Sequence, residues 1–159
     1  MMNDAPLLKA IRDKAMIYCS RKEYCTSEIR KKILSWGCPP EEAVSVIDYL
    51  VENQYLDNRR YTEAYVNDKL RFAKWGRIKI NYMLQMQGVE KDIIKETLAD
   101  IDEHQYQQRL QDELTKKRKS IKAAQPAEVY AKLYRFAAGR GFEPNIIHSI
   151  IQHAVESKK

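Results

Sequence analysis

Apolar positions recur with helical spacing on both sides of three glycines, Gly37, Gly88 and Gly141. Apolar side chains four and eight residues before a glycine line one face of a helix. These side chains are Ile33 and Ile29, Leu84 and Ile80, and Ala137 and Leu133. Apolar residues six and ten positions after each glycine predict a second amphipathic helix. These residues are Ala43 and Ile47, Ile94 and Leu98, and Ile147 and Ile151. The pattern therefore predicts a helix–glycine–helix unit that occurs three times.

Glycine has a physical role at the end of the first helix of each unit. A helix commonly ends with a residue at positive φ, where glycine avoids the steric penalty of a Cβ atom. The residue after the glycine then packs back on the residue that lies four positions before the glycine. The residues expected to pack back in this way are Cys38, Val89 and Phe142.

A further amphipathic helix precedes each unit. The apolar residues of these three helices are Leu8, Ile11 and Ala15; Tyr61, Tyr65 and Phe72; and, over about residues 103–122, Tyr106, Leu110 and Leu114. We expect Asp57 to cap the second of them, and Thr26 to cap the helix that follows the first, because both side chains can accept a hydrogen bond from a free N–H group of the helix.

Together these helices predict an all-α fold of three tandem three-helix repeats, at residues 1–55, 56–102 and 103–159. Each repeat is too small to hide its own apolar face, so neighbouring repeats should stack into an elongated, gently curved body. No segment alternates long enough between apolar and polar residues to predict a strand.

Charge and cysteine content narrow the function classes. The chain has 159 residues and a net charge of +6, and residues 103–159 hold 11 basic against 6 acidic side chains. Such a balance is compatible with a polyanionic partner. Cys19, Cys25 and Cys38 lack metal-ligand spacing and are expected to be reduced and structural. Because no apolar run is long enough for a membrane helix or a secretory signal, we expect a cytoplasmic protein, and the stacked repeats favour a monomer.

Residues for catalysis are hard to find. Motifs for phosphate loops, dinucleotide binding, zinc proteases and serine hydrolases are absent from the sequence. The three histidines, His104, His148 and His153, are scattered, and the carboxylates lie at predicted helix starts or on solvated faces. The sequence therefore predicts a protein that is not an enzyme and has no cofactor or metal site.

Two clusters of basic residues are the candidate binding residues. The first is interleaved with Phe72 and Trp75 and consists of Lys69, Arg71, Lys74, Arg77 and Lys79. The second is a denser run of Lys116, Lys117, Arg118, Lys119 and Lys122. Basic residues beside aromatic rings suit contact with phosphates and stacked bases, but solvated helix faces have the same composition. The partner could be nucleic acid or an acidic protein surface. Sequence-specific reading of DNA is the weaker interpretation, because the second helix of each unit lacks a basic or amide-rich reading face.

Several segments resemble the RecX family, the regulators of the bacterial recombinase RecA. The most specific segment runs from Tyr55 through Asp57 and Arg60 to Tyr61 and resembles the family's Leu-Asp-Asp signature. Trp75-Gly76-Arg77, Gly88-Val89 and Arg140-Gly141-Phe142 are similar to its central and C-terminal blocks, and Thr26-Ser27-Glu28-Ile29 to its first repeat. The resemblance covers about residues 8–155. Two residues depart from the family pattern: Gln54 stands where glycine is usual, and Asn58 where a second aspartate is common.

The resemblance implies a non-catalytic regulator of DNA repair and recombination. Such a protein binds the RecA–DNA filament and inhibits its recombinase, ATPase and co-protease activities, and the two basic clusters are the expected contacts. The residues of the structural signature are Gly37, Tyr55, Asp57, Arg60, Tyr61, Gly76, Gly88, Gly141 and Phe142. Two alternatives stay open: a basic helical module that binds single- or double-stranded DNA directly, and a scaffold without a link to nucleic acid.

Overall fold

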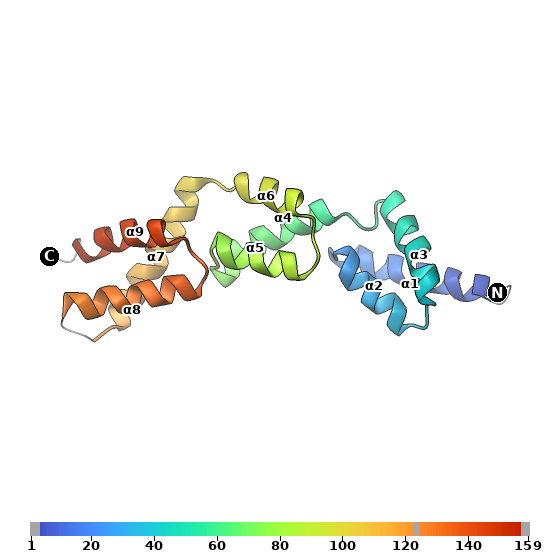
Figure 1. Ribbon diagram of the computed structural model, residues 1–159, viewed down its shortest axis with the longest axis horizontal. Helices are drawn as coiled ribbons and strands as arrows, with labels where there is room; N and C mark the ends of the chain where they lie inside the picture. The colour runs from blue at the N-terminus through green and yellow to red at the C-terminus, as the bar shows by residue number, and fades with distance from the viewer. Residues whose placement is uncertain (1–3, 123–124, 157–159) are drawn as a thin grey trace. The chain divides into compact units, whose positions relative to one another are not determined.

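Every regular element is a helix in the part of the chain that the computed structural model describes, residues 4–122 and 125–156 (Figure 1). The helices are α1 (Asp4–Arg21), α2 (Thr26–Ser35), α3 (Pro40–Glu52), α4 (Asn58–Asp68), the short π-helix η1 (Lys69–Ala73), α5 (Arg77–Met86), α6 (Lys91–Ala99), α7 (Glu103–Ser120), α8 (Pro126–Gly139) and α9 (Pro144–Glu156). The predicted all-α fold is confirmed. The ends of the first and third repeats, residues 1–3 and 157–159, lie outside the described residues. The repeat boundaries and the elongated outline stay predictions.

The chain forms two compact units. One comprises Met1–Tyr65 and Leu84–Ile94, and the other comprises Val66–Met83 and Lys95–Lys159. In the first unit, α1, α2 and α3 pack against one another, and in the second α7, α8 and α9 do so. These two helix triplets are the first and third groups of helices that the repeat pattern predicts.

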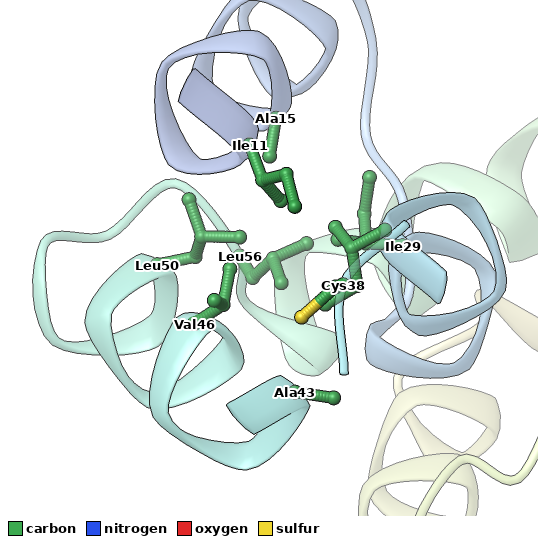
Figure 2. Packing of buried hydrophobic residues seen from close by; sticks show 9 residues of the cluster. Ile11, Ala15, Ile29, Cys38, Ala43, Val46, Leu50 and Leu56 are labelled. Atoms are coloured by element: carbon green, nitrogen blue, oxygen red, sulfur yellow. The ribbon is translucent and has the colours of Figure 1, made fainter. Parts of the chain in front are cut away.

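The core of the first triplet joins one face of each of its helices. Figure 2 shows Ile11 and Ala15 of α1 pointing toward Ile29 of α2 and Leu50 of α3. The cluster contains nine buried residues, which are Ile11, Ala15, Ile29, Ile33, Cys38, Ala43, Val46, Leu50 and Leu56. Burial of this many apolar side chains provides most of the stability of such a small helical unit.

The turns after α2, α5 and α8 have the geometry predicted from the glycine pattern. Gly37, Gly88 and Gly141 have φ of 94°, 77° and 92°. The N–H groups of Cys38, Val89 and Phe142 donate to the carbonyls of Ile33, Leu84 and Ala137 at 3.0, 3.2 and 3.2 Å. This is the Schellman motif, in which the residue after the glycine closes over the last turn of the helix. All six of these residues are buried, so the expected helix–glycine–helix units are confirmed.

Gly141 also lies in a close backbone contact within the second unit. The N–H of Gly76 donates to the carbonyl of Arg140 at 2.7 Å, and that of Ile78 donates to the carbonyl of Gly141 at 2.9 Å. A Cβ atom on Gly76 would lie 2.5 Å from the carbonyl oxygen of Gly141, and one on Gly141 would lie 2.2 Å from Cβ of Lys79. Glycine is therefore needed at both positions to let the start of α5 reach the turn between α8 and α9.

The turn after α3 has the same hydrogen bonds but no glycine. Tyr55 donates its N–H to the carbonyl of Leu50 at 2.8 Å, and Gln54 donates to that of Val51 at 3.1 Å. Gln54 has φ of 63°, which is unfavourable for a residue with a Cβ atom. Glycine would adopt this conformation without that steric penalty.

We expect Gln54→Gly to raise the free energy of unfolding by roughly 0.5–1 kcal/mol, because it removes the strain of the left-handed conformation. Urea unfolding followed by circular dichroism measures the change. Gln111→Gly is the matched control, because Gln111 lies inside α7, where glycine should lower the free energy of unfolding by about 1 kcal/mol. A loss of stability in Gln54→Gly would contradict the assignment of strain to this turn.

Two details of the predicted helices are wrong. Thr26 is the first residue of α2, and the N-cap is Cys25, whose backbone N–H donates to Glu28 Oε1 at 3.0 Å. The N–H of Thr26 instead donates to Asn58 Oδ1 at 3.0 Å. The helix expected to carry Phe72 changes at Lys69 into η1, in which Leu70 is buried and Phe72 is exposed. The longer hydrogen-bonded ring of a π-helix places side chains differently from a continuous α-helix.

Candidate functional site

The basic residues from Lys69 to Lys79 have different environments. The Nζ atoms of Lys69 and Lys79 lie 4.9 and 4.5 Å from the centre of the half-buried Trp75 ring. Cations over an indole face are attracted by its π electrons. Lys74 has φ of 60° and ends η1, and Arg71 is exposed beside Phe72. Trp75 therefore organises two lysines of the cluster, and Arg71 is its most accessible cation.

Arg77 is enclosed by groups of the third helix triplet. Its Nη1 donates to Glu143 Oε2 at 2.7 Å, and its Nη2 donates to Glu103. Its guanidinium lies 3.9 Å from the centre of the Tyr106 ring, and the side chain is only 20% exposed. Burial alone would lower the pKa of Arg77, but its hydrogen bonds to Glu143 and Glu103 raise the pKa above its ordinary value. Arg77 is therefore a permanent cation that joins the start of α5 to α7 and to the turn before α9.

Tyr106 completes this network at its buried end. The ring is fully buried and packs against Phe142, with ring centres 5.3 Å apart. Its hydroxyl donates to Glu143 and accepts the backbone N–H of Arg77 at 2.9 Å. Burial raises the pKa of Tyr106, so the phenol stays protonated and keeps its role as a donor. The network is fully hydrogen-bonded, which is the condition under which buried polar groups stabilise a fold.

The run from Lys116 to Lys122 is divided between two hollows because consecutive residues point in different directions around α7. Lys116 lines one hollow of about 370 Å³, together with Lys74, Arg109, Asp112, Glu113 and Thr115. Lys117 and Lys122 line another hollow, together with residues of α8. Arg118 and Lys119 lie in the last turn of α7, where cations interact favourably with the helix C-terminus. The structure thus brings Lys74 of the first cluster and Lys116 of the second to one hollow, which also contains two carboxylates.

The residues of the Leu-Asp-Asp signature form local contacts within the first unit. Asp57 Oδ1 accepts the N–H groups of Arg59 and Arg60 at 2.9 and 3.1 Å, so the expected cap of α4 is confirmed. Arg60 Nε donates to Glu23 Oε2 at 2.5 Å, and its Nη2 donates to the carbonyl of Gln54 at 3.1 Å. Tyr61 is buried, and burial raises its pKa. These contacts fix the entry of α4 against the loop after α1 and the turn after α3.

Asn58, which stands where the resemblance leads one to expect aspartate, also forms hydrogen bonds through its side-chain amide. Its amide Nδ2 donates to Glu90 Oε2 at 3.1 Å, while its Oδ1 accepts the N–H of Thr26. An amide can donate and accept at the same time, whereas an ionised aspartate only accepts. Asparagine at this position therefore suits a neighbouring glutamate.

The thiols are poor candidates for chemistry. Cys19, Cys25 and Cys38 are free, and burial raises the pKa of each, that of Cys19 to about 11 with a further contribution from Glu23. A thiol with a raised pKa is mostly protonated at neutral pH and is a weak nucleophile. No group of three metal-ligating side chains occurs among the described residues. His148 packs edge-on against Tyr130 and shares a hydrogen bond with its hydroxyl through Nδ1.

The exposure of apolar residues around the first cluster is not predicted by the sequence, and two of them, Ile78 and Tyr82, are not among the candidate residues. Phe72 on η1 is 73% exposed, and on α5 Ile78 and Tyr82 are 51% and 62% exposed. Ile78 and Tyr82 are four residues apart and share one face of α5. The four-residue spacing of Ile78 and Tyr82 is also that of buried residues on a helix face, so only the structure shows that these two side chains are exposed. Aromatic residues and arginine are enriched at protein interfaces.

None of the helices in the described part of the chain has the length and apolar character needed to cross a membrane.

Comparison with known proteins matches the three helix groups in order. Residues 12–50 match the first three-helix domain of RecX, residues 57–98 the second, and residues 103–151 the third. The regulatory protein RecX of Clostridium botulinum (strain Eklund 17B / Type B) is 30% identical over 146 residues, which cover 91% of this chain and 68% of the relative. That of Neisseria meningitidis serogroup C is 29% identical over 146 residues, covering 92% of each chain.

Solved structures show the same fold. The crystal structure of RecX from Lactobacillus salivarius superposes with a TM-score of 0.86 over 97% of this chain and 98% of that one, at 18% sequence identity. A second crystal structure, of a regulatory protein RecX, gives a TM-score of 0.83 over 91% of this chain and 73% of that one. Because three consecutive domains match and a relative reaches 30% identity, the chain belongs to the RecX family of regulatory proteins.

Proposed function

We propose that this protein regulates the RecA recombinase by binding the RecA–DNA filament, and that binding lowers the recombinase, ATPase and co-protease activities of RecA. Membership of a family of regulatory proteins named RecX carries the proposal. Regulation then follows from contact with the filament and needs no chemistry of its own.

The contact residues we propose are cations and exposed apolar side chains between the start of η1 and the middle of α5; of the cations, Arg71 is exposed and Lys74 and Lys79 are partly exposed. They combine Arg71, Lys74 and Lys79 with Phe72, Ile78 and Tyr82. An exposed aromatic residue beside arginine is the kind of side chain that contributes most to protein–protein affinity. Arg77 is left out because its guanidinium is already paired with Glu103 and Glu143.

Inhibition of DNA-dependent ATP hydrolysis by RecA tests the proposal. We expect inhibition at protein concentrations well below those that coat the same DNA in a parallel titration without RecA. Phe72→Ala should raise the half-inhibitory concentration about tenfold, since loss of a central aromatic contact costs roughly 1–2 kcal/mol. Val44→Ala, at an exposed position of α3, is the matched control and should leave it unchanged.

Other outcomes separate the alternatives. Inhibition only when the DNA is saturated with this protein would replace filament binding by competition for DNA. Absence of inhibition at any concentration would overturn the proposed function and leave the fold assignment intact. Equal effects of Phe72→Ala and Val44→Ala would exclude η1 from the contact.

A further inference from the structure

An open hollow of about 620 Å³ lies within the second unit, between the end of α7 and the middle of α8. Its lining consists of four basic residues, Lys117, Lys122, Lys132 and Arg135, together with Ser120, Ile121 and Phe136. Among the residues that the structure describes, no acidic side chain lines it, in contrast to the hollow that contains Asp112 and Glu113.

Ion pairing does not account for the four cations of this hollow. Within the ranges 4–122 and 125–156, ion pairs join other basic residues, such as Arg60 to Glu23 and Arg77 to Glu143, but none of these four. Like charges gathered around one concave surface repel one another and produce a positive potential that an anion would relieve. The hollow is therefore a place where binding of an anion is favourable.

Stabilisation of a helix end explains only part of this arrangement. Lys117 lies in the last turn of α7, where a cation offsets the partial negative charge of the helix C-terminus. Lys132 and Arg135 lie in the interior of α8, Pro126–Gly139, where that effect has faded. They are three residues apart on one face of α8, and both are exposed. Stabilisation of the helix end therefore does not account for Lys132 and Arg135.

An aromatic ring at the hollow indicates the class of ligand. Phe136 follows Arg135 and is half-buried, and its ring lies 5.5 Å from Lys117 Nζ and 4.8 Å from Arg140 Cζ. Positively charged grooves with aromatic rings are the usual means of holding a single nucleic-acid strand, whose phosphates follow the cations. A duplex is instead contacted by elements that protrude into its grooves, and this surface is concave.

We propose that the α7–α8 hollow binds the phosphodiester backbone of single-stranded DNA, with Lys117, Lys122, Lys132 and Arg135 as the phosphate contacts. This site is distinct from the residues of η1 and α5, and it does not depend on contact with RecA. Two of its four cations, Lys132 and Arg135, belong to neither basic cluster recognised from the sequence.

Binding of a fluorescein-labelled oligo-dT strand, measured by anisotropy without RecA at several salt concentrations, tests the proposal. The variant Lys132→Gln/Arg135→Gln should bind roughly tenfold more weakly at low salt. The slope of log affinity against log salt concentration should fall by about 1.4, because each phosphate contact on a single strand contributes about 0.7. Inhibition of RecA by this variant need not change, so this site and the proposed function can fail separately.

The control removes the same charge elsewhere. Arg30→Gln/Lys31→Gln changes two exposed basic residues of α2 in the first unit and should leave the affinity and the slope unchanged. Equal losses in both variants would mean that only net charge matters and would overturn the site. A polyglutamate peptide that displaces the strand at equal charge concentration would also overturn it, in favour of an acidic protein ligand. Unchanged binding in the α8 variant has the same consequence for the proposed DNA site.

Discussion

Gly141→Ala is expected to lower the free energy of unfolding by roughly 3–5 kcal/mol. Two independent penalties add at this position. An alanine at φ of 92° is strained, and its Cβ atom would lie 2.2 Å from Cβ and 2.6 Å from the backbone N of Lys79. The backbone of α5 cannot move away without breaking the hydrogen bond from Ile78 N–H to the carbonyl of Gly141. Urea unfolding followed by circular dichroism measures the loss.

Gly37→Ala separates the two penalties. Gly37 has nearly the same φ, 94°, but among the described residues no atom beyond its own chain neighbours lies within 4 Å of the position of its Cβ. Its substitution should cost only about 1–2 kcal/mol from backbone strain. Gly76→Ala would cause a steric clash without the strain of a positive φ. Its Cβ atom would meet the backbone of Gly141 and Phe142 at 2.5–2.6 Å. If Gly37→Ala and Gly141→Ala were equally destabilising, the close approach between α5 and the turn after α8 would be contradicted.

Arg77→Ala is expected to lower the free energy of unfolding by about 2–3 kcal/mol. The substitution leaves Glu143, whose side chain is 22% exposed, and Glu103 without their guanidinium partner. It also removes the cation over the buried Tyr106 ring. The penalty stays below that of a fully buried ion pair because water still reaches part of both carboxylates.

Arg71→Ala is the control for Arg77→Ala, since it removes an equal charge from an exposed position only six residues away. Its effect on the free energy of unfolding should lie within about 0.5 kcal/mol. A double-mutant cycle with Glu143→Gln should show coupling between positions 77 and 143 and none between 71 and 143. Equal stabilities of the two arginine variants would show that Arg77 is not a structural residue.

The periodic features of the fold could be predicted because they depend on local sequence. Helix faces and positive-φ glycines follow from spacings of a few residues, and Gly37, Gly88 and Gly141 were identified with their partners. The cap at Asp57 is equally local. The cap falls on Cys25 and not on Thr26 because Glu28 accepts the N–H of Cys25, so the helix starts one residue earlier than the side-chain preference for threonine at a cap suggests.

Features that depend on distant residues could not be predicted in the same way. Arg77 looks like one more cation in a basic cluster until Glu143, 66 positions later, is found at its guanidinium. Lys132 and Arg135 join Lys117 only because α7 and α8 lie side by side. The exposure of Phe72 depends on η1, and its spacing from Tyr65 gave no sign of the π-helix.

The π-helix η1 sets a fixed length for the segment between α4 and α5. Each ring that it closes, such as the one from Lys74 N–H to the carbonyl of Lys69, contains one residue more than a ring of an α-helix. A chain one residue shorter here could close the same segment as an ordinary α-helix. Trp75 and Gly76 would then be displaced by about 1.5 Å along the helix axis and rotated by about 100° around it. Gly76 would no longer face the carbonyl of Arg140, so deletions within residues 69–73 should be tolerated less well than substitutions at the same positions.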